Sequence, residues 1–249
     1  MLCVILCAYN EELAIQSVLS LLRETAKEIS LEVILVDDAC RDRTYALASS
    51  YLMRMPLRII RHERNWGLGL SLRQAMEIAV AGLGDDDYIV TMDADATHPP
   101  QFISRMIEVL EKSQADVAIA SRYAGEGSGE RGMPILRRVI AKIARLLFAL
   151  RFLYIWSVKD STTGFRCYRA GALRRLLDEN GKIMLNQKGF AVQMEILLAL
   201  RKRGMRVAEA PFLMNYRLKR SASGLRWASA CRDYLALLLR GPINRSLKK

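Results

Sequence analysis

Short apolar runs alternate with amphipathic segments in the first half of this chain, and this alternation constrains the fold more than any other feature. Strands that alternate with helices predict β-α-β units and a mostly parallel sheet. The runs are continuously apolar, which is typical of strands buried on both faces, so we expect an α/β chain with helices on both faces of the sheet. The predicted strands are Leu2–Ala8, Leu31–Val36, Leu57–Arg61, Tyr88–Met92 and Val117–Ser121, and the predicted helices cover about 12–27, 44–53, 68–82 and 100–112.

Polar residues follow four of these strands at the point where each strand ends. In open α/β sheets, ligands bind outside the carboxyl ends of the strands. We therefore expect the four turns to line a single cleft. They read Ala8-Tyr9-Asn10-Glu11, Asp37-Asp38 continuing to Asp42 and Thr44, Asn65-Trp66-Gly67-Leu68-Gly69, and Asp93-Ala94-Asp95.

The turn after Met92 carries the sharpest chemical signal, because an apolar strand stops there and presents the carboxylates of Asp93 and Asp95. Hard cations such as Mg²⁺ prefer oxygen ligands and usually take one or two carboxylates plus substrate phosphates. The pair therefore predicts a Mg²⁺ or Mn²⁺ site and a nucleotide-diphosphate substrate. Asp85 and Asp87 have the same spacing but open the strand, where a solvated turn is the simpler interpretation.

Charge divides the chain into halves of opposite sign. Residues 1–122 hold 12 Lys and Arg against 18 Asp and Glu, whereas residues 123–249 hold 26 against 8. A basic half of this kind predicts an acidic ligand, a membrane surface or nucleic acid as its partner. Aromatic residues make up only 7% of the chain and no recognised nucleic-acid motif occurs, so we expect no nucleic-acid partner.

The segment Pro134–Trp156 resembles a membrane span in its apolar content, but its five basic residues make it too charged to cross hydrocarbon. Arg138, Lys142 and Arg145 share one helical face, which is typical of a basic amphipathic helix lying in a membrane interface. Residues 226–249 predict a second such element, and an ordinary pair of core helices is the alternative. No apolar stretch reaches 18 residues, so we expect a peripheral chain unless a small partner subunit anchors it.

Taken in order, the four turns resemble the motifs of the family-two glycosyltransferases of the GT-A fold. Four later segments are similar to the dolichol-phosphate mannose synthase branch of that family. The resemblance covers about residues 4–226 and implies one continuous GT-A, Rossmann-like domain, in which residues 1–122 bind a nucleotide sugar and residues 123–249 bind the acceptor and face the membrane. The later segments are Ser121-Arg122-Tyr123, Asp160 with Thr163-Gly164-Phe165-Arg166, Lys188-Gly189-Phe190 with Gln193 and Glu195, and Glu209-Ala210-Pro211 leading to Arg217.

The resemblance assigns the first half to the donor. Asp38 and Asp37, at the end of the second strand, would contact the base or ribose, with helix capping as the alternative. Glu11 could equally be an acidic residue of the first helical turn that the helix dipole stabilises. Thr97 would hold a water on the metal, whereas for His98 a structural position is favoured over a ligand. The metal residues are Asp93, Asp95 and Thr97, and the donor-binding residues are Ala8, Tyr9, Asn10, Glu11, Asp37, Asp38, Asn65, Gly67 and Ala94.

The second half would bind the acceptor, because phosphates are held well by forked hydrogen bonds from arginine. The resemblance assigns this role to Arg122, Arg166 and Arg217, and Arg138, which precedes an apolar stretch of the basic half, is a further candidate. After Arg217 the sequence departs from the branch's usual Arg followed by Gly-x-Ser-Lys, since Gly224 stands near the expected Lys.

Two carboxylates, Asp160 and Glu195, remain as candidates for the reacting centre. Asp160 would orient an arginine or contact the donor sugar, with a turn cap as the alternative, and Glu195 would contact substrate. Where the wider family commonly places Glu-Asp, this chain has Gln193-Met194-Glu195. Hydroxyl acceptors need a general base, but a phosphate monoester is already anionic at pH 7, so the missing aspartate favours a phosphate acceptor.

These observations predict a metal-dependent, inverting glycosyltransferase that moves a hexose, with mannose favoured, from GDP-mannose or a UDP-sugar to dolichyl or polyprenyl phosphate. A saccharide or small hydroxyl acceptor on the same fold is the alternative. Five scattered cysteines without a C-x-x-C pair indicate reduced thiols. We therefore expect a cytoplasmic protein, peripheral on the cytoplasmic face of a membrane.

Overall fold

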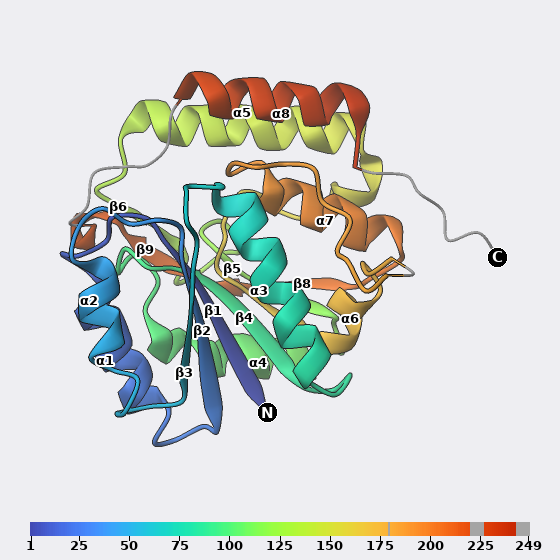
Figure 1. Ribbon diagram of the computed structural model, residues 1–249. Coiled ribbons are helices and arrows are strands. Elements are labelled where there is room, and N and C mark those ends of the chain that lie inside the picture. Colours follow the sequence, from blue (N-terminus) through green and yellow to red (C-terminus); the bar gives the residue numbers. More distant parts are fainter. Residues whose placement is uncertain (179, 220–226, 243–249) are drawn as a thin grey trace.

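All five strands predicted from the sequence are present, and two further strands extend their sheet to seven (Figure 1). The computed structural model describes residues 1–178, 180–219 and 227–242. The strands are β1 (Leu2–Ala8), β2 (Leu31–Asp37), β3 (Leu57–Arg61), β4 (Tyr88–Asp93), β5 (Val117–Ser121), β7 (Arg166–Arg169) and β8 (Val207–Pro211). They lie in the order β3-β2-β1-β4-β7-β5-β8, and each neighbouring pair is parallel except the two that involve β7.

The helices of the first half begin and end close to their predicted positions. The first of them starts at residue 15 instead of residue 12, because residues 11 and 12 donate their N–H groups to Thr44 Oγ1 (2.8 Å) and Asp42 Oδ2 (3.1 Å) of the next loop. The helices are α1 (Ile15–Thr25), α2 (Thr44–Ser49), α3 (Leu68–Gly82), α4 (Ile103–Lys112) after the 3-10 turn η1 (Pro100–Phe102), α5 (Ile135–Arg151), η2 (Leu153–Ile155), α6 (Ala170–Arg174), α7 (Val192–Lys202), η3 (Tyr216–Leu218) and α8 (Trp227–Arg240).

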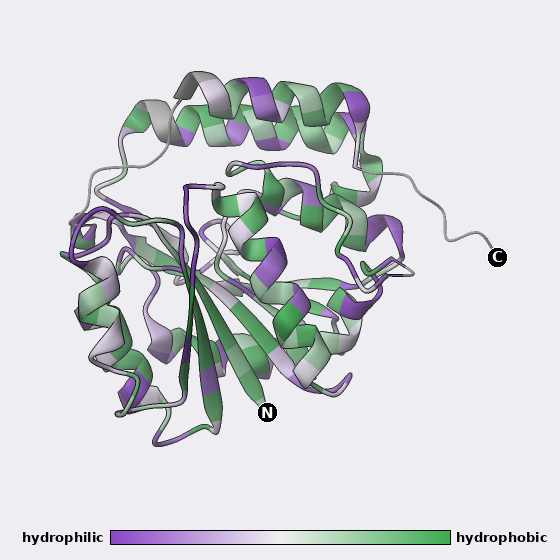
Figure 2. Ribbon diagram, viewed as in Figure 1, coloured by the Kyte–Doolittle hydropathy of each residue, from purple (hydrophilic) through white to green (hydrophobic). Residues whose placement is uncertain are grey.

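The sheet is buried on both faces, as its continuous apolar strands predict. Alternate side chains of a strand point to opposite faces, so Cys3 and Ile5 of β1 join a core with α3, α6 and α7, whereas Val4 and Leu6 join a core with α1, α2 and α4. Figure 2 shows the strands mostly in the colour of hydrophobic residues. Helices therefore cover both faces of the sheet, so a ligand can reach it only at the ends of the strands.

The order of the strands reverses at β1, because the chain continues from β1 to β2 and β3 on one side and returns to β4 on the other. Cys7 lies opposite Asp93 and Ala8 lies opposite Asp37. The ends of β1, β2 and β4 therefore meet where ligands bind in open α/β sheets. Asp87 lies at the opposite edge and accepts the Gly84 N–H (2.8 Å) in a turn, as predicted.

Helices α5 and α8 lie side by side across the edge where the strands end (Figure 1). The predicted amphipathic helix is present as α5, but two of its three aligned basic residues bond to the body: Arg138 Nε donates to Glu130 (2.8 Å) and Arg145 Nε donates to the Val158 carbonyl (3.2 Å). Its exposed side is mainly apolar. The exposed large apolar residues of α5, η2 and α8 are Ile135, Val139, Ile143, Leu146, Leu147, Leu150, Leu153, Leu235 and Leu239.

Within the described ranges, none of the helices combines the length and apolarity that crossing a membrane requires. Residues 220–226, which include most of the segment that departs from the branch pattern, lie outside the described residues. So do residues 243–249 at the end of the second predicted interface element, whose described part is α8. A two-stranded sheet of β6 (Gly129–Arg131) and β9 (Leu213–Asn215) leads the chain to residues 216–219.

The start of α3 packs directly against a distant loop, because Gly69 donates its N–H to the Lys188 carbonyl (2.8 Å). A Cβ at Gly69 would lie 1.8 Å from the Gln187 carbonyl oxygen, whereas a Cβ at Gly82, at the other end of the same helix, meets nothing within 4 Å. The close approach of the two backbones therefore requires glycine at the first position and not at the second.

We expect Gly69→Ala to lower the free energy of unfolding by about 1–3 kcal/mol, as overpacked sites do. Its matched control, Gly82→Ala, gains helix propensity of up to about 1 kcal/mol and should be neutral or stabilising. Chemical denaturation of both variants measures the difference. Equal stability of the two would contradict the packing described for this loop.

Candidate active site

A cleft of about 860 Å³ lies where β1, β2 and β4 end, and its volume is typical of a small-molecule site. Most of the predicted donor-binding residues line it, together with several that were not predicted. The predicted residues in its lining are Ala8, Tyr9, Glu11, Asp38, Asn65, Trp66, Gly67, Leu68, Asp93, Ala94 and Asp95, and the additional ones include Lys188, Phe190 and Lys219. Asn10, Asp37 and Thr97 are not among the residues that line it.

Asp93 ends β4 with its side chain 38% exposed toward this cleft. Its backbone N–H donates to Nδ1 of His98 (2.9 Å), and the His98 ring is buried and stacked on Phe165 with centroids 4.8 Å apart. His98 therefore fixes the end of the strand, in agreement with the structural position predicted for it, and leaves the Asp93 carboxylate directed toward the cleft.

Asp95 is buried and surrounded by donors. Thr97 donates both its N–H (3.1 Å) and its hydroxyl (2.6 Å) to Oδ1, and Ala96 takes a left-handed conformation (φ 65°) that turns the chain to permit this. The other oxygen, Oδ2, accepts a hydrogen bond from the Lys219 ammonium. Burial acts in the opposite direction, but the Lys219 charge holds the pKa of Asp95 below its ordinary value.

These residues fit a divalent cation. Asp93 and Asp95 offer the hard oxygen donors that Mg²⁺ and Mn²⁺ prefer, and substrate phosphates commonly complete such sites. Within the part of the chain that the structure describes, no group of three or more His, Cys, Asp or Glu could hold a metal alone. The ammonium on Asp95 also shows that this position accommodates positive charge.

Asp38 organises the wall of the cleft. Its Oδ1 accepts the Trp66 N–H (2.8 Å) and lies 2.7 Å from His62 Nδ1, and its Oδ2 accepts the Gly67 N–H (2.8 Å). The His62 ring stacks on Trp66 with centroids 4.4 Å apart. Both carboxylate oxygens thus hold the turn after β3, so a contact of Asp38 with base or ribose remains a proposal.

The neighbouring turns are linked by similar short bonds. Asp37 is buried, accepts the Cys40 N–H (2.7 Å) and pairs with Arg61 Nε (3.1 Å). Asn10 has φ 58° and accepts the Arg41 N–H through its side chain (2.8 Å). The side chains of Asp37 and Asn10 are thus hydrogen-bonded within the protein and set the shape of the loops beside the cleft.

A buried ion-pair network lies beside the cleft. Arg122 binds Asp160 through two parallel hydrogen bonds of 2.7 Å, donates to Thr162 Oγ1 (2.8 Å) and lies 3.2 Å from Glu130. Burial acts in the opposite direction, but the Arg122 charge lowers the pKa of Asp160 and the Asp160 charge raises the pKa of Arg122. Asp160 therefore orients an arginine, which is one of the two roles predicted for it.

Two predicted substrate residues, Arg166 and Glu195, are enclosed by the chain, and a third, Arg217, lies on the surface. Arg166 is fully buried and donates to the carbonyls of Thr163 (2.9 Å), Gln193 (2.7 Å) and Ser161 (2.9 Å), so its guanidinium is enclosed by backbone and does not line the cleft. Arg217 is exposed and its side chain covers Gly132. The placement of Arg166 corrects the prediction that it contacts phosphate, whereas a phosphate contact of the exposed Arg217 stays a prediction.

Glu195 also departs from its predicted role. Its carboxylate is buried and accepts the N–H groups of Asn186 (3.0 Å) and Gln187 (2.9 Å). Burial raises the pKa of Glu195, and these bonds only partly offset it. Glu195 therefore supports the loop that carries Lys188 and Phe190 into the cleft and does not itself line it.

A family model described as glycosyl transferase family 2 matches residues 3–179. The dolichol-phosphate mannosyltransferase of Pyrococcus furiosus is 32% identical over 216 residues, which are 87% of this chain and 57% of that protein. The polyprenol monophosphomannose synthase of Mycolicibacterium smegmatis is 28% identical over 229 residues, which are 90% of this chain and 83% of that protein. The chain thus spans little more than half the length of the Pyrococcus relative.

Among solved structures, glucosyl-3-phosphoglycerate synthase of Mycobacterium tuberculosis in complex with Mn²⁺, UDP and phosphoglyceric acid has a TM-score of 0.67 at 20% identity. The match covers 98% of this chain and 80% of that chain. A second structure of that synthase, with Mg²⁺ and UDP, has a TM-score of 0.66 at 19% identity and covers 96% and 78%. Likeness at this level of identity shows the fold.

The strand order and the carboxylates at the end of β4 define a GT-A glycosyltransferase fold with its cleft at the reversal of the sheet. The match of the family model extends over most of the chain. The chain belongs to glycosyl transferase family 2.

The Arg122–Asp160 pair makes a prediction about stability and pH. Because the folded-state pKa of Asp160 is depressed below its ordinary 3.8, the pair contributes stability above that pH, and this contribution is lost as the pH falls through the folded pKa. We expect Asp160→Asn to lower the free energy of unfolding at pH 7 by about 3–5 kcal/mol, since it leaves a buried charge unpaired.

Chemical denaturation between pH 7 and pH 3 measures this effect. The difference between wild type and Asp160→Asn should be constant above about pH 5 and should shrink below pH 4. A difference that stays constant down to pH 3, or that grows as the pH falls, would show that the pair is not the source of the stability.

Proposed function

We propose that this glycosyltransferase moves a hexose, with mannose favoured, from a nucleotide-diphosphate sugar to a dolichyl or polyprenyl phosphate. The observation that carries this proposal is an apolar groove that opens into the cleft at Asp93. The names of the Pyrococcus and Mycolicibacterium relatives support the same acceptor class.

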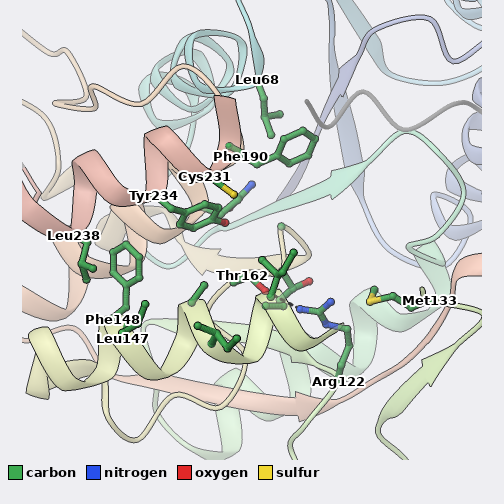
Figure 3. Close-up of a pocket in the computed structure, with 18 of the residues that line it drawn as sticks. Leu68, Arg122, Met133, Leu147, Phe148, Thr162, Phe190, Cys231, Tyr234 and Leu238 are labelled. Carbon is green, nitrogen blue, oxygen red and sulfur yellow. Dashed lines mark hydrogen bonds between the residues drawn. The ribbon is translucent and has the colours of Figure 1, made fainter. Parts of the chain in front are cut away.

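The apolar groove has a volume of about 340 Å³ and lies between α5 and α8. Figure 3 shows Phe148 and Leu238 toward one end of it and Arg122 with Thr162 toward the other. Five residues line both the groove and the cleft, so the two spaces are continuous: Leu68, Asp93, Phe190, Met214 and Ala230. A phosphate on an apolar chain would thus reach Asp93 with its chain between the two helices.

The cleft would hold the nucleotide diphosphate of GDP-mannose or a UDP-sugar, with residues 1–122 forming most of its wall. A divalent ion on Asp93 and Asp95, with Thr97 behind them, would neutralise the charge of the departing diphosphate. Trp66 is 40% exposed there and offers a flat surface for a ring. Lys188 adds a cation to the same lining.

Cations for the acceptor phosphate gather around Tyr123. Arg122 Cζ lies 5.3 Å and Lys142 Nζ lies 6.0 Å from the centre of that ring, and Arg138 pairs with Glu130, which accepts the Tyr123 hydroxyl (2.7 Å). Residues 122–151 thus bring three basic side chains to one end of the groove. In this proposal Arg122 and Arg138, which the sequence predicts, contact the phosphate, whereas Arg166 does not.

The positions of the two other candidate carboxylates favour a phosphate acceptor. Asp160 binds Arg122 and Glu195 binds backbone N–H groups, so both are occupied by the chain. A saccharide acceptor would need a base to take its hydroxyl proton, whereas a phosphate monoester attacks as an anion. The reaction then depends mainly on positioning the two substrates in one cleft.

The exposed apolar side of α5 and α8 would rest on a membrane. Seven large apolar residues between 135 and 153 are exposed, and a patch of this kind marks an interaction surface. Lys142, Arg151 and Arg240 are exposed beside it and would favour anionic lipids. The location on the cytoplasmic face and a small anchoring subunit belong to the proposal, as does the absence of a nucleic-acid partner.

Transfer of labelled sugar tests the function directly. Purified protein with Mn²⁺ and vesicles that contain polyprenyl phosphate is incubated with labelled GDP-mannose or UDP-glucose, and label is counted in the lipid extract. We expect label from one donor, and Asp93→Asn should reduce its transfer by at least about 100-fold, because several kcal/mol of charge stabilisation is lost.

Asp85→Asn is the matched control, since Asp85 has the same spacing in the sequence but lies 72% exposed before β4. It should transfer label at the wild-type rate. Label that appears only on a water-soluble saccharide acceptor would replace the lipid acceptor with the alternative. Wild-type activity of Asp93→Asn would remove the metal from the proposal.

Sedimentation with anionic vesicles tests the membrane-facing surface. Leu150 and Leu239 are 57% and 71% exposed, and burying one such side chain in lipid is worth about 1.5–3 kcal/mol, so Leu150→Glu with Leu239→Glu should weaken vesicle binding by at least about 100-fold. Met53→Glu, at a 97% exposed position after α2, is the control for charge. Equal binding of the two variants would place the membrane elsewhere.

A further inference from the structure

Lys219 occupies the place in the cleft where the divalent cation is expected. It follows η3, and its ammonium donates to Oδ2 of Asp95, with side chains that are 12% and 9% exposed. Asp93 and Glu11 also lie near enough to raise the pKa of Lys219, after Asp95 itself and against the effect of burial. The ammonium thus pairs with one carboxylate, Asp95, and the charges of Glu11 and Asp93 lie in its neighbourhood.

Asp95 needs a cation, because it is buried and a buried charge without a partner is costly. Asp95 shares its Oδ1 with Thr97, so Oδ2 is the oxygen through which it meets positive charge. A metal ion bound directly to Oδ2 and the Lys219 ammonium cannot share that position, since their charges repel and their volumes overlap.

We propose that Lys219 is a built-in counter-ion, which a divalent cation must displace from Asp95. The inference rests on the proposed function only in assigning a metal and a nucleotide diphosphate to the cleft. Lysine suits this role because its ammonium is a compact charge on a flexible four-carbon stem, and it can move without loss of the fold.

Displacement couples the metal to the nucleotide. Without a nucleotide, the ammonium that leaves Asp95 loses its partner, and this cost weakens metal binding. A diphosphate in the cleft gives the ammonium a new anion, because Lys219 lines the same cleft. Metal and nucleotide diphosphate therefore bind cooperatively, and by linkage each raises the affinity of the other by the same factor.

Manganese titration followed by electron paramagnetic resonance tests this competition without any turnover. We expect Lys219→Met to bind Mn²⁺ alone at least about tenfold more tightly than wild type, because Asp95 then has no internal cation. With GDP or UDP present at one fixed concentration, the difference between the two proteins should fall below about threefold.

Two variants serve as controls. Lys219→Arg keeps a cation beside Asp95 and should bind Mn²⁺ as weakly as wild type. Lys27→Met removes the same charge from the end of α1, where Lys27 pairs with Glu24 on the surface, and should leave the affinity unchanged. Thermal melting of each variant reports whether the fold is retained.

Chemical labelling of Lys219 gives a second readout on the wild-type protein. A water-soluble acylating reagent, followed by mass spectrometry, should modify Lys219 slowly in the free protein. Addition of Mn²⁺ alone should increase the rate, since the ammonium then leaves Asp95, whereas labelling of Lys27 should stay constant.

Equal Mn²⁺ affinity of wild type and Lys219→Met, or weaker binding by the variant, would overturn the inference and leave the proposed transfer intact. The expected Mn²⁺ affinities combined with no label in the lipid extract would overturn the proposed function alone. If Mn²⁺ binds to neither wild type nor Lys219→Met, with or without nucleotide, both the proposed metal site and the counter-ion role of Lys219 are wrong.

Discussion

Negative charge at the end of β4 is the constraint on which the rest of the structure depends. The register of the sheet brings Asp93 beside Cys7, and the turn that follows points Asp95 inward beneath it. Asp93 and Asp95 are two residues apart, and the left-handed turn at Ala96 with the bonds from Thr97 holds Asp95 in place. The protein meets the constraint with Lys219, and a metal with its diphosphate would meet it in the same place.

The cleft continues into the apolar groove between α5 and α8, and different carboxylates support the two spaces. Beside the cleft, the carboxylates of Asp38 and Glu195 accept backbone N–H groups and hold the loops that form the cleft wall. On the other, Asp160 and Glu130 hold Arg122 at the inner end of the groove between α5 and α8. The buried carboxylates outside the turn after β4 thus mainly hold loops and Arg122 in place. In the proposed reaction, the cleft would take the polar donor and the groove the apolar acceptor.

The strands and the cleft could be predicted because both follow from local patterns. Three strands have the predicted bounds and two extend one residue further, since continuous apolar runs between polar turns leave little choice of register. The roles of Arg166, Glu195 and Lys219 could not be predicted in this way. Each depends on a partner that lies far away in the sequence, such as the Gln193 carbonyl for Arg166 or Asp95 for Lys219. A charged residue in a motif reads the same whether it faces a substrate or a backbone carbonyl.

The orientation of α5 shows a related limit. Its spacing predicts an amphipathic helix, but which side faces the protein depends on Glu130 and on the carbonyl of Val158, which no helical pattern contains. The helix consequently turns Arg138 and Arg145 toward the body and leaves Leu146, Leu147 and Leu150 exposed. The spacing of charged residues therefore predicts that a helix is amphipathic, but it does not predict which side of the helix faces solvent.

Anomalous diffraction from crystals soaked with Mn²⁺ and a nucleoside diphosphate measures the central claim most directly. The account predicts a manganese peak within bonding distance of Asp93 or Asp95, with the diphosphate on its far side and the Lys219 ammonium withdrawn from Oδ2. Diphosphate bound without manganese, with Lys219 still on Asp95, would contradict it.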